Sequence, residues 1–185
     1  MCRRLVSGLV LVVAAFGCTL PGSSAEAPAG AYGLGRPASE AEIRAWDIDV
    51  APSGEGLPPG QGTVKRGAQV YVLRCAACHG PTGREGPQDR LAGGRDTLTS
   101  AHPVKTVGSY WPYATTLYDY IRRAMPFDAP QSLSPDEVYS VVAWLLHQNG
   151  IIDDEAVMDA RTLPQIRMPN RDGFIPDPRP DVPRR

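Results

Sequence analysis

The sequence predicts a mainly α-helical protein in which one compact helical domain lies between two long irregular extensions. Apolar residues recur at helical spacing in three segments of residues 62–150. The chain contains 19 glycines and 19 prolines, and these crowd residues 28–62 and 164–185, which are too interrupted for long helices. A length of 185 residues suits one such domain with extensions better than two complete cores.

The N-terminus is typical of an export signal. Arg3 and Arg4 form a charged start, and residues 5–16 form an apolar stretch too short to span a bilayer comfortably. Small residues up to Ala25 fit a peptidase site after that position. We therefore divide the chain into a signal peptide (1–25), an N-terminal arm (26–61), a helical domain (62–150) and a C-terminal extension (151–185).

A lipid anchor is the competing interpretation of this leader. Cys18 would become a lipidated N-terminus after cleavage by a lipoprotein peptidase, although Phe16 is bulky for such a site. We expect a periplasmic protein that is attached to the membrane only if Cys18 is lipidated. Without residues 1–25, 17 basic residues face 20 acidic ones, a net charge of about −3, which implies no face for nucleic acid.

The first predicted helix runs from Thr63 into a pair of cysteines. Val64, Tyr71 and Cys75 lie on its apolar face. Gly67 interrupts this helix at a cost of about 1 kcal/mol, and we expect it to let another helix cross closely.

Two further helices follow after a long loop. The second begins after Pro112 and ends at Met125, because Pro126 cannot continue a helix. The third opens at Ser134 with a capping box and closes at Asn149 and Gly150. Its apolar face consists of Val138, Val141, Val142, Leu145 and Leu146.

Cys75, Cys78 and His79 form a C-x-x-C-H sequence, the attachment signature of a covalent c-type haem. The two thiols can add to the two vinyl groups of one haem, and the histidine is then placed to bind the iron on the proximal side. A thioredoxin-like site would require a βαβ context, which is missing around this motif. A zinc site would require more clustered ligands, and the other cysteines, Cys2 and Cys18, lie in the leader.

Met125 is the leading candidate for the distal iron ligand. It follows the second helix, and Pro126 stiffens the backbone that would present its sulfur. Met168, which also precedes a proline, and a histidine such as His102 are the alternatives, whereas we expect His147 to lie on a helix surface. Histidine and methionine together would close the iron to substrates and favour one-electron transfer.

Three aromatic residues just before the second helix are candidate haem contacts. Tyr110, Trp111 and Tyr113 could pack on the macrocycle while their polar tips bind the haem propionates. Ordinary core packing is an equally good interpretation of these three rings.

The order of these features resembles the class I cytochrome c family. In that family a helix leads into C-x-x-C-H, a later helix ends in Met-Pro, and a terminal helix follows. The resemblance implies that Gly67 and Tyr71 meet Trp144 where the first and last helices cross. It also implies that Met125 is the distal ligand.

Several longer runs are similar to the cytochrome subunits of bacterial sulfur-oxidising dehydrogenases of the SoxD type. They are residues 45–50, 107–116, 122–127 and 168–174. The resemblance implies a partner subunit with a molybdenum cofactor that oxidises a sulfur compound, and a downstream cytochrome acceptor. This chain has one C-x-x-C-H where larger members have two haems, so a sulfite-type arrangement fits equally well.

The two extensions carry more apolar residues than free linkers require. Trp46, Ile48, Ile166, Met168 and Phe174 lie in them, and we expect these segments to wrap the domain or dock on another subunit. Three functions stay open from the sequence: an electron-transfer subunit of this or another periplasmic dehydrogenase, a catalytic cytochrome with a displaceable ligand, and a redox-active thiol protein.

Overall fold

The computed structural model describes residues 34–175 and 177. The predicted signal peptide, its cleavage site and Cys18 lie outside the described residues, as does most of the segment after residue 175. The chain divides into two compact units, residues 1–38 and 39–185. The architecture described below is that of the second unit.

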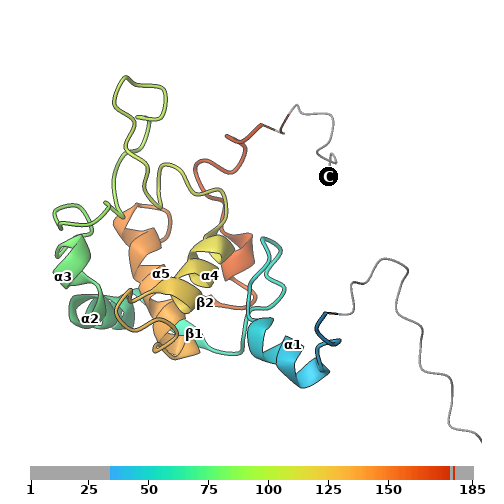
Figure 1. Ribbon diagram of the computed structural model, residues 1–185. Coiled ribbons are helices and arrows are strands. Elements are labelled where there is room, and N and C mark those ends of the chain that lie inside the picture. The colour runs from blue at the N-terminus through green and yellow to red at the C-terminus, as the bar shows by residue number, and fades with distance from the viewer. Residues whose placement is uncertain (1–33, 176, 178–185) are drawn as a thin grey trace, which may run out of the picture. The chain divides into compact units, whose positions relative to one another are not determined.

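Helices dominate this unit, which confirms the predicted fold class (Figure 1). In chain order the elements are α1 (Glu40–Trp46), β1 (Gln61–Thr63), α2 (Val64–Arg74), α3 (Ala76–His79), α4 (Ala114–Ala124), α5 (Pro135–Gln148), β2 (Val157–Asp159) and the 3-10 helix η1 (Leu163–Gln165).

The helix ends lie where the local sequence predicts them. The Thr63 side chain accepts a hydrogen bond from the Arg66 N–H at the start of α2. Ser134 and Glu137 form the predicted capping box at the start of α5. Met125 is the C-cap of α4, directly before Pro126.

The crossing of α2 and α5 forms the centre of the domain. A Cβ atom at Gly67 would lie 1.9 Å from the carbonyl oxygen of Ser140, so only glycine permits this approach. One turn later Tyr71 stacks on Trp144, with ring centroids 3.8 Å apart. The predicted meeting of Gly67, Tyr71 and Trp144 is confirmed.

The N-terminal arm contains one short helix that the sequence interpretation did not include. Ser39 and Glu42 form a capping box that starts α1. None of the residues in α1 is buried. The predicted irregular arm is therefore interrupted by seven helical residues, a length that apolar periodicity alone does not reveal.

A two-stranded antiparallel sheet joins the C-terminal extension to the start of α2. Gln61 pairs with Asp159, and Thr63 pairs with Val157. Strands of three residues are too short to show an alternating pattern, so periodicity does not predict them.

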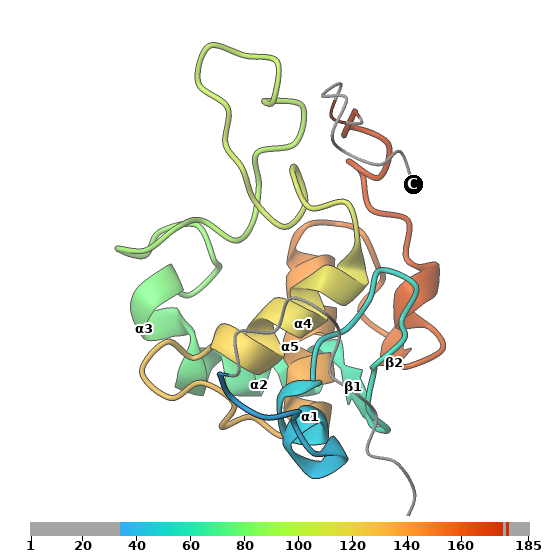
Figure 2. The same cartoon turned by 45° about the vertical axis from the view of Figure 1, so that its right-hand side comes forward.

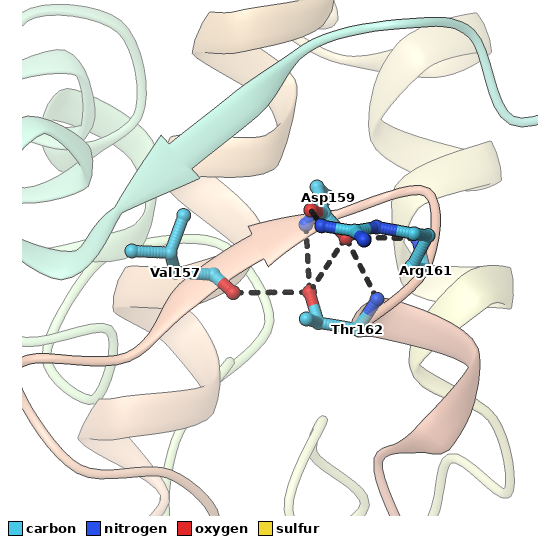
Figure 3. A network of polar contacts seen from close by, with 4 residues as sticks. All are labelled: Val157, Asp159, Arg161 and Thr162. Carbon is cyan, nitrogen blue, oxygen red and sulfur yellow. Dashed lines mark hydrogen bonds and ion pairs between the residues drawn. The ribbon is translucent and has the colours of Figure 1, made fainter.

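A tight turn follows β2 and redirects the chain (Figure 3). Asp159 Oδ1 accepts hydrogen bonds from the backbone N–H groups of Arg161 and Thr162, each at 2.8 Å. These bonds, that of Thr162 first, lower the pKa of the Asp159 carboxyl. The turn leads the chain into η1, where Leu163 is fully buried.

The C-terminal extension contributes to the hydrophobic core. Met158, Leu163 and Met168 are buried in the same cluster as the apolar face of α5. Residues 157–168 thus wrap the domain, one of the two arrangements that their composition predicts. Phe174 and Ile175, farther along, are exposed.

Candidate haem-attachment site

The C-x-x-C-H residues lie at the junction of α2 and α3. Cys75 is the C-cap of α2, and its N–H donates to the Tyr71 carbonyl. The single turn of α3 then carries Cys78 and His79. Gly80 ends this turn with φ +78°, a conformation that favours glycine. The helical turn therefore presents both thiols and the imidazole within one short segment.

The imidazole of His79 is oriented by a main-chain acceptor. Its Nδ1 lies 2.8 Å from the carbonyl oxygen of Asp89. Nδ1 donates in this contact, because a carbonyl oxygen can only accept. The other ring nitrogen, Nε2, then carries the lone pair that a metal requires.

The loop that supplies this acceptor folds back tightly over the motif. The Gln88 N–H donates to the Cys78 carbonyl at 3.0 Å. A Cβ atom at Gly86 would lie 2.2 Å from the same Cys78 oxygen, so this close return requires glycine. The loop contacts thus fix the orientation of the His79 ring.

The two thiols are free and differ in environment. Cys75 is partly buried and Cys78 is exposed. Burial raises the pKa of the Cys75 thiol to about 11, and the nearby Cys78 adds to this effect while Arg74 opposes it. Redox-active cysteine pairs depend on a lowered thiol pKa, so this environment disfavours the thioredoxin-like interpretation.

Met125 lies at the end of α4 that approaches the motif. It is partly buried and packs against the core. The loop that follows is joined to the end of α2, because Arg74 donates to the Ser132 hydroxyl. Figures 1 and 2 both show this end of α4 and its loop beside α2 and α3. The fold thus brings the Met125 segment and the C-x-x-C-H segment to the same side of the domain.

The alternative distal ligands lie in less suitable places. Met168 is almost completely buried in the hydrophobic core. His102 is exposed in the long loop between α3 and α4. Nδ1 of His147 contacts the Ile152 carbonyl at 3.3 Å near the end of α5. These positions favour Met125.

The three aromatic candidates have partners within the protein. Phe174 makes an edge contact with the ring of Tyr110 at 5.3 Å between centroids. The Arg171 guanidinium lies 4.1 Å from the centre of the Tyr113 ring. Trp111 packs against Tyr120 at 5.7 Å. Residues of the C-terminal extension thus contact the rings of both Tyr110 and Tyr113.

The residues at the site fit a covalent haem. One oriented histidine and a partly buried methionine match the two protein ligands of a six-coordinate c-type haem, and the two cysteine thiols match its two points of covalent attachment. Within residues 34–175 and 177, no group of three or more His, Cys, Asp or Glu side chains could hold a metal ion by itself. The donor set therefore suits a haem iron better than zinc.

Comparison with known proteins supports this assignment. Residues 64–149 match the sequence profile of a family described as cytochrome c. A search of the solved structures finds a chain of the sulfane dehydrogenase SoxCD from Paracoccus pantotrophus, with 46% sequence identity and a TM-score of 0.74. The match covers 80% of this chain and 73% of that chain. No curated protein sequence matches.

This chain belongs to the cytochrome c family. Family membership implies covalent haem c and a role in electron transfer rather than catalysis. The second match confirms the predicted resemblance to the cytochrome subunits of sulfur-oxidising dehydrogenases. In the part of the cytochrome that the structure describes, no helix combines the length and apolarity needed to cross a membrane.

Sequence reasoning missed two groups at this site. The Asp89 acceptor is a backbone carbonyl, which every residue has, so residue type carries no signal for it. The contact between Arg74 and Ser132 joins residues that are 58 positions apart in the sequence, and no local sequence pattern predicts a contact over that separation.

Proposed function

We propose that this protein is a periplasmic cytochrome with one haem that carries single electrons from a molybdenum-containing sulfite or sulfane dehydrogenase to a downstream cytochrome. The identity of 46% to a chain of the SoxCD complex over most of both chains is the observation that favours this donor. The single C-x-x-C-H in the sequence supports one haem. The leader at residues 1–25 supports export, and residues 62–150 are the proposed haem domain.

The residues have distinct roles in this proposal. Cys75 and Cys78 hold haem through thioether bonds, and bound haem supplies the one-electron iron couple. His79 is the proximal ligand, and its contact with the Asp89 carbonyl fixes the ring so that Nε2 is the nitrogen left for iron. Met125 is the distal ligand.

The protein contributes mainly by keeping this site unchanged during electron transfer. Thioether sulfur favours reduced iron, so a Met125 ligand raises the potential relative to a second histidine. The loop across Cys78 and the C-cap of α4 position the two proposed ligands. Neither ligand has to dissociate when the charge changes, so the reorganisation that accompanies each transfer is small.

Two measurements test the proposal. The protein is matured in a host that attaches haem, and its haem content and reduced spectrum are recorded. We expect one haem per chain and the absorption bands of a c-type cytochrome, with no change when carbon monoxide is added. Absence of these bands would refute the haem assignment, and carbon monoxide binding would indicate an open iron.

Isolation from the native periplasm tests the partner. A molybdenum protein should co-purify with the cytochrome and should reduce it when given sulfite or a sulfane-sulfur compound. Co-purification with an alcohol dehydrogenase instead would retain the cytochrome assignment and replace the donor.

A further inference from the structure

One face of α4 is fastened to the N-terminal arm by polar contacts. At one end of the helix, Thr115 Oγ1 donates to the Pro52 carbonyl at 3.1 Å. At the other end, Arg122 Nη1 donates to the Ile48 carbonyl, also at 3.1 Å. The arm therefore follows α4 over about two turns of the helix.

Asp119 makes the central contact of this series. Its Oδ1 accepts hydrogen bonds from the Val50 N–H and from Arg123 Nε, both at 2.9 Å. Its Oδ2 also pairs with Arg123 Nη2. Asp119 and Val50 are both buried. Burial of a carboxylate is costly unless an ion pair and hydrogen bonds compensate for it. Here the backbone of the arm supplies one of these partners.

These contacts fix α4 in a way that its apolar face does not. Leu117 and Ile121 pack into the core, but apolar contacts are non-directional and tolerate small shifts along the helix axis. Hydrogen bonds to fixed carbonyl and N–H groups of the arm do not tolerate such shifts. The arm thus adds directional contacts that oppose a shift of α4 along its axis.

The position of α4 is transmitted directly to the proposed iron ligand. Met125 is the C-cap of α4, and its N–H donates to the Ile121 carbonyl at 3.1 Å. It lies two residues after Arg123, so no flexible segment separates it from the Asp119 contacts. A shift of the helix would move the Met125 backbone with it.

We propose that Asp119 is a positioning residue that holds α4 against residues 48–52 of the N-terminal arm and thereby keeps Met125 on the haem iron. The inference rests on the proposed function, because Met125 is the proposed distal ligand. It gives the arm a role in setting the redox site, separate from any docking on a partner.

The test uses the full-length, haem-loaded protein with Asp119→Ala and Asp119→Asn. Alanine removes the hydrogen bonds to Val50 and Arg123. Asparagine keeps an oxygen for the Val50 N–H and removes the charge. Asp136→Ala is the matched control. Asp136 Oδ1 also accepts a hydrogen bond from a backbone N–H of the arm, that of Gln61 at 2.8 Å, but Asp136 lies on α5 and not on α4. Cyanide binding to the ferric protein, the absorption band from methionine-to-iron charge transfer and the midpoint potential are measured.

For Asp119→Ala we expect cyanide affinity to rise about tenfold, the equivalent of one lost hydrogen bond to a charged group. The methionine band should weaken and the midpoint potential should fall. Asp119→Asn should show a smaller change in cyanide binding, and Asp136→Ala should match the unchanged protein. Loss of a nearby negative charge alone would raise the potential, so the sign of the shift separates positioning from electrostatics.

Wild-type cyanide binding and an intact methionine band in Asp119→Ala would overturn the inference. If Asp119→Ala does not mature, Asp119→Asn replaces it, because asparagine keeps the side-chain volume and removes the charge that pairs with Arg123. Wild-type cyanide binding and an intact methionine band in that variant would equally overturn the inference. A Met125→Ala variant with the wild-type spectrum would instead refute the proposed ligand, so the two failures are distinguishable.

Discussion

The ring of Tyr71 stacks on the indole of Trp144, with the ring planes inclined by 28°. The Tyr71 hydroxyl also donates to the Gly80 carbonyl at 3.0 Å, directly after His79. One side chain thus joins the crossing of α2 and α5 to the segment that carries the proposed haem ligands. The core of the domain and the geometry of the site are therefore physically connected.

Gly67→Ala should strongly destabilise the protein. The added methyl group would collide with the Ser140 carbonyl, and overpacking of this kind costs about 1–3 kcal/mol. Thermal unfolding of the haem-loaded protein measures the loss. Lys65→Ala, at an exposed position of the same helix, is the control and should change little. Equal stability of the two variants would contradict the close crossing.

Met125→Ala should lower the midpoint potential and open the iron to cyanide and carbon monoxide, because it removes the proposed distal ligand. Redox titration and optical spectra check this result. Met168→Leu is the matched control, since it replaces a buried methionine by a side chain of similar size. If Met168→Leu produced the spectral change and Met125→Ala did not, the ligand assignment would pass to Met168.

The Glu137 carboxylate in the capping box of α5 should contribute its full stabilisation only above acidic pH. Hydrogen bonds from the Ser134 backbone N–H, and then from its hydroxyl, lower the pKa of the Glu137 carboxyl. Because the folded pKa lies below the unfolded value, the contribution is complete above about pH 4.5 and is lost as the pH falls through the folded pKa.

Glu137→Gln should therefore reduce the free energy of unfolding at pH 7 by up to about 1 kcal/mol, an upper value because the group is largely exposed. Chemical denaturation at pH 7 and pH 3 measures the difference. The difference between variant and parent should shrink at the lower pH. A difference that is the same at both values would indicate that the Glu137 charge contributes nothing.

Leu163→Ala should show that the C-terminal extension is part of the core. Leu163 is fully buried, and removal of such a side chain costs about 2–5 kcal/mol. Ile175→Ala, an exposed position in the same extension, should leave the denaturation midpoint unchanged. Similar midpoints for both variants would mean that residues beyond 150 do not stabilise the domain.

Structural features that depend on a few neighbouring residues were predicted correctly. The start of α5 at the Ser134 capping box and the end of α4 before Pro126 depend on neighbouring residues alone. Gly67 by itself predicted that another helix crosses closely, whereas Trp144 was predicted as its partner only through the family resemblance, because a glycine in a helix does not identify its neighbour. Strands of three residues and the helix α1 carry too little periodicity to be predicted.

The haem motif of Cys75, Cys78 and His79 is determined by the sequence alone, because thiol attachment and proximal ligation need only adjacent residues. The tertiary structure decided which groups hold that motif and the segment of the proposed distal ligand, Met125. The Asp89 carbonyl reaches His79, and the N-terminal arm reaches Asp119 across 69 residues. Backbone groups make both contacts, and their partners are chosen by chain folding and not by residue type.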